Sequence, residues 1–93
     1  MTDTNELIEI RRKRLKFRSW HRGMREMDLL LGRFADRFLD AYGEDDLNLY
    51  EEILEISDPD LYNWVSGREA IPDSAGQKII MDLKEFTLSR SSP

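Results

Sequence analysis

The chain has 93 residues, no cysteine, 40% apolar residues and a formal net charge of −5. This length suits one domain with a single core, and the lack of cysteine excludes a disulfide framework and a thiolate metal site. No window reaches the roughly 18 to 20 apolar residues that span a bilayer, and no signal-peptide pattern begins the sequence. We therefore expect no membrane insertion and a cytoplasmic location in a bacterium, or the mitochondrial matrix if a transit peptide has been removed.

Charge is distributed unevenly along the sequence. Eight of the 14 basic residues lie between Arg11 and Arg25 with no acid among them, whereas residues 40–60 hold nine acids and no Lys or Arg. Such a split can steer an oppositely charged partner, although it names no function by itself.

The first predicted helix begins near Asp3, where Asp3 and Glu6 have capping-box spacing, and runs toward His21. Its amphipathic pattern is imperfect, because Leu7, Ile8 and Leu15 lie off the main apolar stripe. We expect residues 1–10 to form a frayed extension. The stripe predicted to face the core consists of Ile10, Phe17, Trp20 and Met24.

The second helix has the clearest periodicity, with acids and arginines largely on its outer faces. It should end at Tyr42 and Gly43, where glycine can take the left-handed conformation that closes a helix. A third helix is predicted from about Asp46, with acids in its first turn and apolar residues on one side. The core positions of the second helix are Met27, Leu30, Leu31, Phe34, Ala35 and Phe38.

A fourth, short helix is predicted at Asp58, because Asp58 can cap a helix whose first position is Pro59. A last helix should begin around Pro72 and Asp73 and continue to about Leu88, leaving a polar tail at residues 89–93. No segment has the period-two pattern of a strand. The sequence therefore predicts an all-α fold, a small five-helix bundle forming a single domain. The inward side chains of the fourth helix should be Leu61, Trp64 and Val65.

Catalytic and metal-binding patterns are weak. The one histidine, His21, has no cysteine, serine or carboxylate at a spacing that suggests a triad, and Glu26 and Asp28 are two residues apart on different helix faces. No spaced Cys/His set or EF-hand loop is present. We expect neither an enzyme nor a metal site.

The basic cluster leaves nucleic-acid binding open as an alternative. A small nucleic-acid-binding or antitoxin-type regulator could use the basic face of the first helix to neutralise phosphates, with Phe17 and Trp20 among the cations. The isoelectric point of about 4.8 counts against it, and we expect no nucleic-acid partner.

The segment from Arg22 to Asp28 lies between two apolar patterns and is not needed for packing. Gly23 would cost about 1 kcal/mol inside a helix, so it is better placed in a turn, where it would also let a partner's backbone approach. Glu26 would then lie in the first turn of the second helix, interacting with the helix dipole or pairing with Arg22 or Arg25. The segment is typical of an exposed, charged protein-binding turn.

The string from Arg11 to Ala35, RRKRLKFRSWHRGMREMDLLLGRFA, resembles the SdhE/succinate dehydrogenase assembly factor 2 family of flavinylation factors. The resemblance continues through Leu47–Tyr50 and Asp58–Trp64 and covers residues 11–88, which we take as the helical domain. Arg22, Gly23 and Glu26 fill the family's R-G-x-x-E motif, and Met27 stands where leucine is usual, a change that conserves volume.

The resemblance implies a five-helix protein that binds the flavoprotein subunit of succinate dehydrogenase, and in some bacteria of fumarate reductase. Such a protein promotes covalent attachment of FAD to a histidine of that client. The histidine and the FAD would both belong to the client, so we expect no stably bound cofactor in this chain. The predicted partner-binding residues are Arg14, Arg22, Gly23, Arg25, Glu26 and Asp28.

Overall fold

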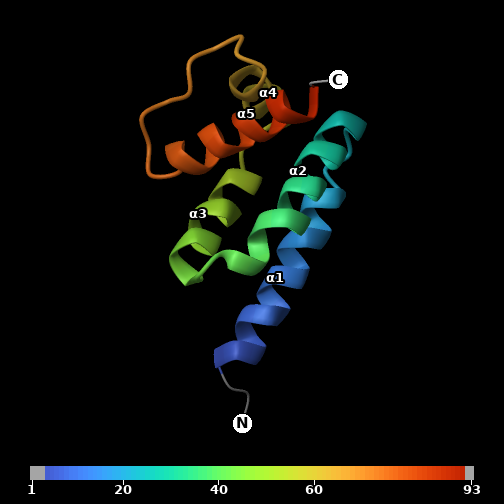
Figure 1. The fold of residues 1–93 in the computed structure, drawn as a ribbon, viewed down its shortest axis with the longest axis vertical. Helices are drawn as coiled ribbons and strands as arrows, with labels where there is room; N and C mark the ends of the chain where they lie inside the picture. The colour runs from blue at the N-terminus through green and yellow to red at the C-terminus, as the bar shows by residue number, and fades with distance from the viewer. Residues whose placement is uncertain (1–3, 92–93) are drawn as a thin grey trace.

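The computed structural model describes residues 4–91 and the side chains of residues 7–89. The capping box predicted at Asp3 and Glu6 lies outside the described part. The described residues form five α-helices and one short 3-10 helix, with no strand, which confirms the predicted all-α, five-helix fold (Figure 1). The elements are α1 (Thr4–Trp20), α2 (Arg25–Phe38), η1 (Leu39–Ala41), α3 (Glu44–Leu54), α4 (Asp58–Val65) and α5 (Gln77–Ser91).

Helices α1 and α2 form an antiparallel pair, and α3 lies beside them, while α4 packs on α5, which in turn packs against α2 and α3 (Figure 1). Met27, Leu31 and Phe34 of α2 are fully buried. The ring of Phe34 stacks on Tyr50 of α3 and meets Phe86 of α5 edge-on. Helix α2 is the centre of the core, as its periodicity predicted.

The predicted core stripe of α1 is wrong at Ile10 and Phe17. These side chains are 58% and 63% exposed, whereas Leu15, which was placed off the stripe, is fully buried. The reason is that α1 packs against α2 on one side and α3 on the other, so its inward face lies between the two contacts. That face also carries Ser19, whose buried hydroxyl is 2.7 Å from both Leu15 O and the Tyr50 hydroxyl.

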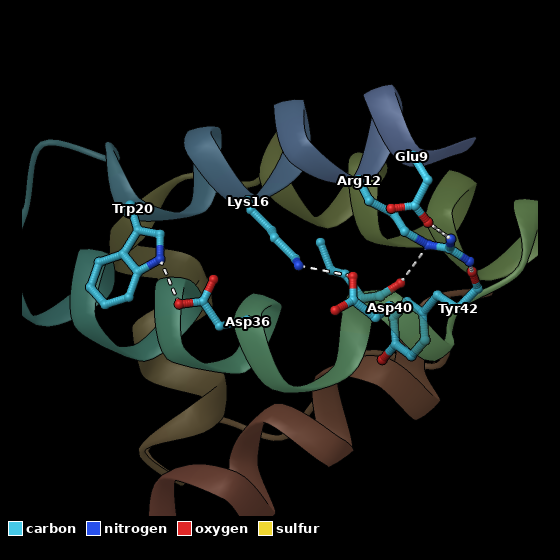
Figure 2. Close-up of polar contacts among 8 residues, drawn as sticks. Glu9, Arg12, Lys16, Trp20, Asp36, Asp40 and Tyr42 are labelled. Atoms are coloured by element: carbon cyan, nitrogen blue, oxygen red, sulfur yellow. Dashed lines mark hydrogen bonds and ion pairs between the residues drawn. The ribbon is translucent and has the colours of Figure 1, made fainter. Parts of the chain in front are cut away.

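Trp20 packs against α2 at a glycine. A Cβ added to Gly32 would lie 2.2 Å from Trp20 Cδ2, far inside van der Waals contact. The indole N–H also donates to Asp36 Oδ2 at 3.2 Å (Figure 2). Gly32 therefore lets the indole lie directly on the α2 backbone, an approach that any larger residue would block.

Several predicted helix ends differ from the structure. Gly43 has a φ of −81° and precedes α3 instead of closing α2 in a left-handed conformation. The 3-10 helix η1 follows directly on α2, and α3 begins at Glu44. Ser57, and not Asp58, caps α4, because its hydroxyl accepts from the backbone N–H of Asp60 at 3.4 Å.

Helix α5 begins at Gln77, later than predicted. Residues 73–76 form bends and turns before it. Gly76 lies against Ile53, and a Cβ added to Gly76 would be 3.5 Å from that side chain, an ordinary contact distance. In α4, Leu61 and Val65 are buried as expected, whereas Trp64 is only partly buried.

Candidate partner-binding site at the turn between α1 and α2

The turn between α1 and α2 is built around Gly23. Its φ of +98° lies in the left-handed region that disfavours other residues. A Cβ at this position would meet no described atom within 4 Å. The backbone conformation, and not crowding, therefore requires glycine in the isolated chain, and the surface around it is open.

Asp28 holds the turn from the inside. Its Oδ1 accepts from the backbone N–H groups of Arg22, at 2.5 Å, and Gly23, at 3.2 Å. A carboxylate that accepts hydrogen bonds from two backbone N–H groups before a helix stabilises the backbone conformation of the turn. The turn is consequently ordered before any partner arrives.

The side chain of Arg22 is bonded to the other half of the molecule. Its Nε lies 2.8 Å from Asp58 Oδ1, and its two terminal nitrogens donate to the carbonyls of Leu54 and Ile56. The Arg22 and Asp58 side chains are only 11% and 18% exposed. Arg22 thus ties the turn to the junction of α3 and α4, and it pairs with Asp58 and not with Glu26.

The structure divides the six predicted site residues into two groups. The side chains of Arg22 and Asp28 point inward and form bonds within the fold. The others are exposed, and among the described side chains none forms an ion pair with them. This exposed group consists of Arg14, Gly23, Arg25 and Glu26.

Glu26 lies at the edge of a groove between α2, α4 and α5. The groove has a volume of about 390 Å³ and is lined by the partly or fully buried side chains of Met27, Leu30, Tyr62 and Val65, among others. A carboxylate beside apolar side chains offers a partner both a charged and a hydrophobic contact. The sequence did not predict this groove, because its walls come from three helices.

Most of the basic cluster between Arg11 and Arg25 is used within the fold. Five of its eight cations form ion pairs with described acids: Arg11 with Glu51, Arg12 with Glu9, Lys16 with Asp40, Arg18 with Glu55 and Arg22 with Asp58. The bonds from Arg12 and Lys16 to η1 and to Tyr42 are seen in Figure 2. The nucleic-acid alternative is therefore left with few free cations on α1.

His21 follows the end of α1 and is held by Phe17. The two rings stack with centroids 4.0 Å apart, and His21 Nδ1 is 2.6 Å from Phe17 O. An open hollow of about 320 Å³ beside them is lined by Phe17, Arg18, His21, Arg22 and Asp58. No Ser, Thr, Cys or Lys side chain lines this hollow. In the described part of the chain no three His, Cys, Asp or Glu side chains are grouped as metal ligands.

The family model described as "Flavinator of succinate dehydrogenase" matches residues 13–87. The chain belongs to this family. The Sdh5/SdhE resemblance stated from the R-G-x-x-E motif is thereby confirmed, and the family is one of assembly factors and not of catalytic enzymes.

Individual relatives agree with the family match. The chain is 39% identical over 78 residues to "FAD assembly factor SdhE" of Acetobacter pasteurianus, covering 84% of this chain and 72% of the relative. It is 41% identical over 63 residues to "Succinate dehydrogenase assembly factor 2, mitochondrial" of Debaryomyces hansenii, covering 68% of this chain and 44% of the relative. The like-named Saccharomyces cerevisiae protein is 36% identical over 88 residues, covering 90% of this chain and 54% of the relative.

The chain therefore spans about half the length of the mitochondrial relatives it matches, and more of the bacterial one. None of the described helices combines the length and the apolar character needed to cross a bilayer.

Proposed function

We propose that this Sdh5/SdhE-family chain binds the flavoprotein subunit of succinate dehydrogenase and promotes covalent attachment of FAD to a histidine of that subunit. The observation that carries the proposal is the turn between α1 and α2, in which exposed Gly23 and Glu26 are presented by the bonds of Arg22 and Asp28. A turn ordered in advance binds with less loss of conformational entropy than a mobile one.

Within this proposal the exposed and the inward residues act differently. Gly23 lets the client's backbone approach, while Glu26, Arg25 and Arg14 make charge-assisted hydrogen bonds or steer the encounter. Arg22 and Asp28 contribute by fixing the shape of this surface, since their side chains already have partners in the fold.

The chain acts by positioning and not by supplying reacting groups. Holding the client's histidine against the flavin ring lowers the entropic part of the barrier to bond formation. The FAD stays with the client, and this chain binds no cofactor stably. The flavoprotein subunit of fumarate reductase is a further proposed client in bacteria that have it, and the proposed bacterial location is the cytoplasm.

The test measures flavin fluorescence of the client subunit in a denaturing gel after incubation with FAD and this chain. We expect Gly23→Arg and Glu26→Ala to lower the rate of flavin attachment at least tenfold, with unchanged helical circular dichroism. The matched controls are Gly67→Arg, at another exposed glycine with a φ of +85°, and Glu44→Ala, at an exposed acid in the first turn of α3.

Both controls should support flavin attachment at the wild-type rate. If Gly23→Arg and Glu26→Ala also do so, the turn is not the working surface. If the wild-type chain fails to raise the rate above that of the client alone, the proposed function is wrong.

A further inference from the structure

Helix α1 has a second apolar face that points away from the core. Leu7, Ile10 and Phe17 are 57%, 58% and 63% exposed, and they are three of the five large apolar side chains exposed in the described part of the chain. Together with Arg14 and His21 they occupy positions 7, 10, 14, 17 and 21. We call this set the outer stripe.

The spacing of the outer stripe is that of a helix-packing surface. Steps of three and four residues keep all five side chains on one face, and the alternation of three and four is the seam of a coiled coil. From Leu7 to His21 the stripe is about 21 Å long at the usual rise of a helix. The face is thus long enough to accept nearly four turns of a partner helix.

The end of the outer stripe nearest the turn is preorganised. Phe17 stacks on His21 at 4.0 Å, and the imidazole is held by the carbonyl of Phe17. An exposed aromatic side chain that is already fixed has the character of a binding hot spot, because little rotamer entropy is lost on burial. Packing within this chain does not explain its exposure.

The cations at the centre of the outer stripe indicate which kind of partner can cover it. Arg14 lies at its middle and Lys13 beside it; both are exposed, and neither forms an ion pair with a described side chain. A second copy packed symmetrically along the stripe would bring these cations together, which is unfavourable. An anionic membrane would repel a protein with a net charge of −5. A partner helix that carries both apolar and acidic side chains complements the stripe.

We infer that the outer stripe is a second docking surface for the client flavoprotein subunit, which packs on it an amphipathic helix with acidic side chains opposite Arg14 and Lys13. The inference rests on the proposed function, since it takes the same partner. It extends the docking surface along α1 from the turn to Leu7. In this arrangement the outer stripe provides affinity for the client, and the turn promotes flavin attachment.

The test separates affinity from the rate of attachment. With the flavoprotein subunit and FAD, we expect Phe17→Ala, Ile10→Ser and Arg14→Glu each to weaken the Kd about tenfold or more. At saturating concentration Phe17→Ala and Ile10→Ser should keep a near wild-type rate of attachment, unlike Gly23→Arg. Phe17→Trp and Arg14→Lys should restore binding. Met81→Ser, at an exposed apolar residue of α5, and Lys78→Glu, at an exposed cation, should leave the Kd unchanged.

Other outcomes overturn the inference. Unchanged client affinity in the outer-stripe variants would exclude the docking surface while leaving the proposed function intact, as judged by wild-type flavin attachment. Loss of a dimer in sedimentation, with unchanged client affinity, would assign the stripe to a second copy. Loss of binding to vesicles of anionic phospholipid, again with unchanged client affinity, would assign it to a membrane. A wild-type chain that binds no flavoprotein subunit would overturn both proposals.

Discussion

The guanidinium of Arg22 lies 2.8 Å from the carboxylate of Asp58, across 36 residues of sequence. The same side chain donates to the carbonyls of Leu54 and Ile56. The arginine of the R-G-x-x-E motif therefore links the turn after α1 to the junction between α3 and α4. This contact makes the motif partly structural, and it leads to the first prediction.

Replacing Arg22 should cost stability as well as activity. Arg22→Ala leaves the mostly buried carboxylate of Asp58 and two carbonyls without their donor, so we expect a loss of about 2 to 4 kcal/mol in the free energy of unfolding. Arg22→Lys should recover part of it, because an ammonium group cannot reproduce the planar fork of bonds. Urea unfolding followed by circular dichroism measures both. Arg25→Ala, at an exposed arginine with no ion pair to a described side chain, is the control and should change stability by less than about 0.5 kcal/mol.

Asp28 should control the order of the turn more than the stability of the whole chain. Asp28→Ala removes the acceptor of the Arg22 and Gly23 backbone N–H groups, so these two amides should exchange with solvent faster. Asp28→Asn keeps an oxygen at the position and should retain part of the protection. Amide hydrogen exchange measured by NMR provides the test. Equal exchange in wild type and Asp28→Ala would show that the carboxylate does not brace the turn.

Gly32 should tolerate no side chain. In Gly32→Ala the new methyl group meets the Trp20 ring, so the indole must move and lose its bond to Asp36. We expect a loss of about 1 to 3 kcal/mol from this overpacking, with a change in tryptophan fluorescence. Gly43→Ala is the matched control, since its φ is −81° and no described atom lies within 4 Å of the added Cβ. If Gly32→Ala unfolds at the wild-type temperature, the close packing of Trp20 is not a constraint.

Two tyrosines should make the fold sensitive to alkali. Burial raises the pKa of Tyr42 to about 12 from 10.0, and burial raises the pKa of Tyr50 more strongly still. The folded chain therefore keeps phenol protons that the unfolded chain loses, so stability is complete below pH 10 and falls as the pH rises toward the folded pKa. The loss between pH 8 and 11 should be about 1 kcal/mol per tyrosine, and less for half-buried Tyr42 because solvent screens it.

The double variant Tyr42→Phe, Tyr50→Phe tests this dependence. It should be less stable than wild type at pH 8, because Ser19 loses its bond to the Tyr50 hydroxyl. Its stability should nevertheless fall less between pH 8 and 11, as measured by urea unfolding at each pH. A parallel fall in both proteins would show that other groups cause the alkaline loss.

The sequence by itself determined the fold class and the family. The periodicity of α2 defines its buried face because its apolar residues recur at helical spacing, and the local string from Arg22 to Glu26 carries the motif. Gly23 was also predictable as a turn residue, because its cost inside a helix is a local property of the backbone. The partner-binding roles of all six site residues stay predictions: Arg14, Arg22, Gly23, Arg25, Glu26 and Asp28.

Only the tertiary structure decided which face of α1 is buried and what Arg22 bonds. Helix α1 has apolar residues on two faces, so periodicity could not choose between the stripe of Leu15 and Ser19 and that of Ile10 and Phe17; the positions of α2 and α3 made the choice. The pairing of Arg22 with Asp58 joins segments far apart in the chain, and no spacing rule encodes such a contact. The turn that the sequence marked as a charged surface is thus exposed at Gly23 and Glu26 because Arg22 and Asp28 are turned inward to hold it.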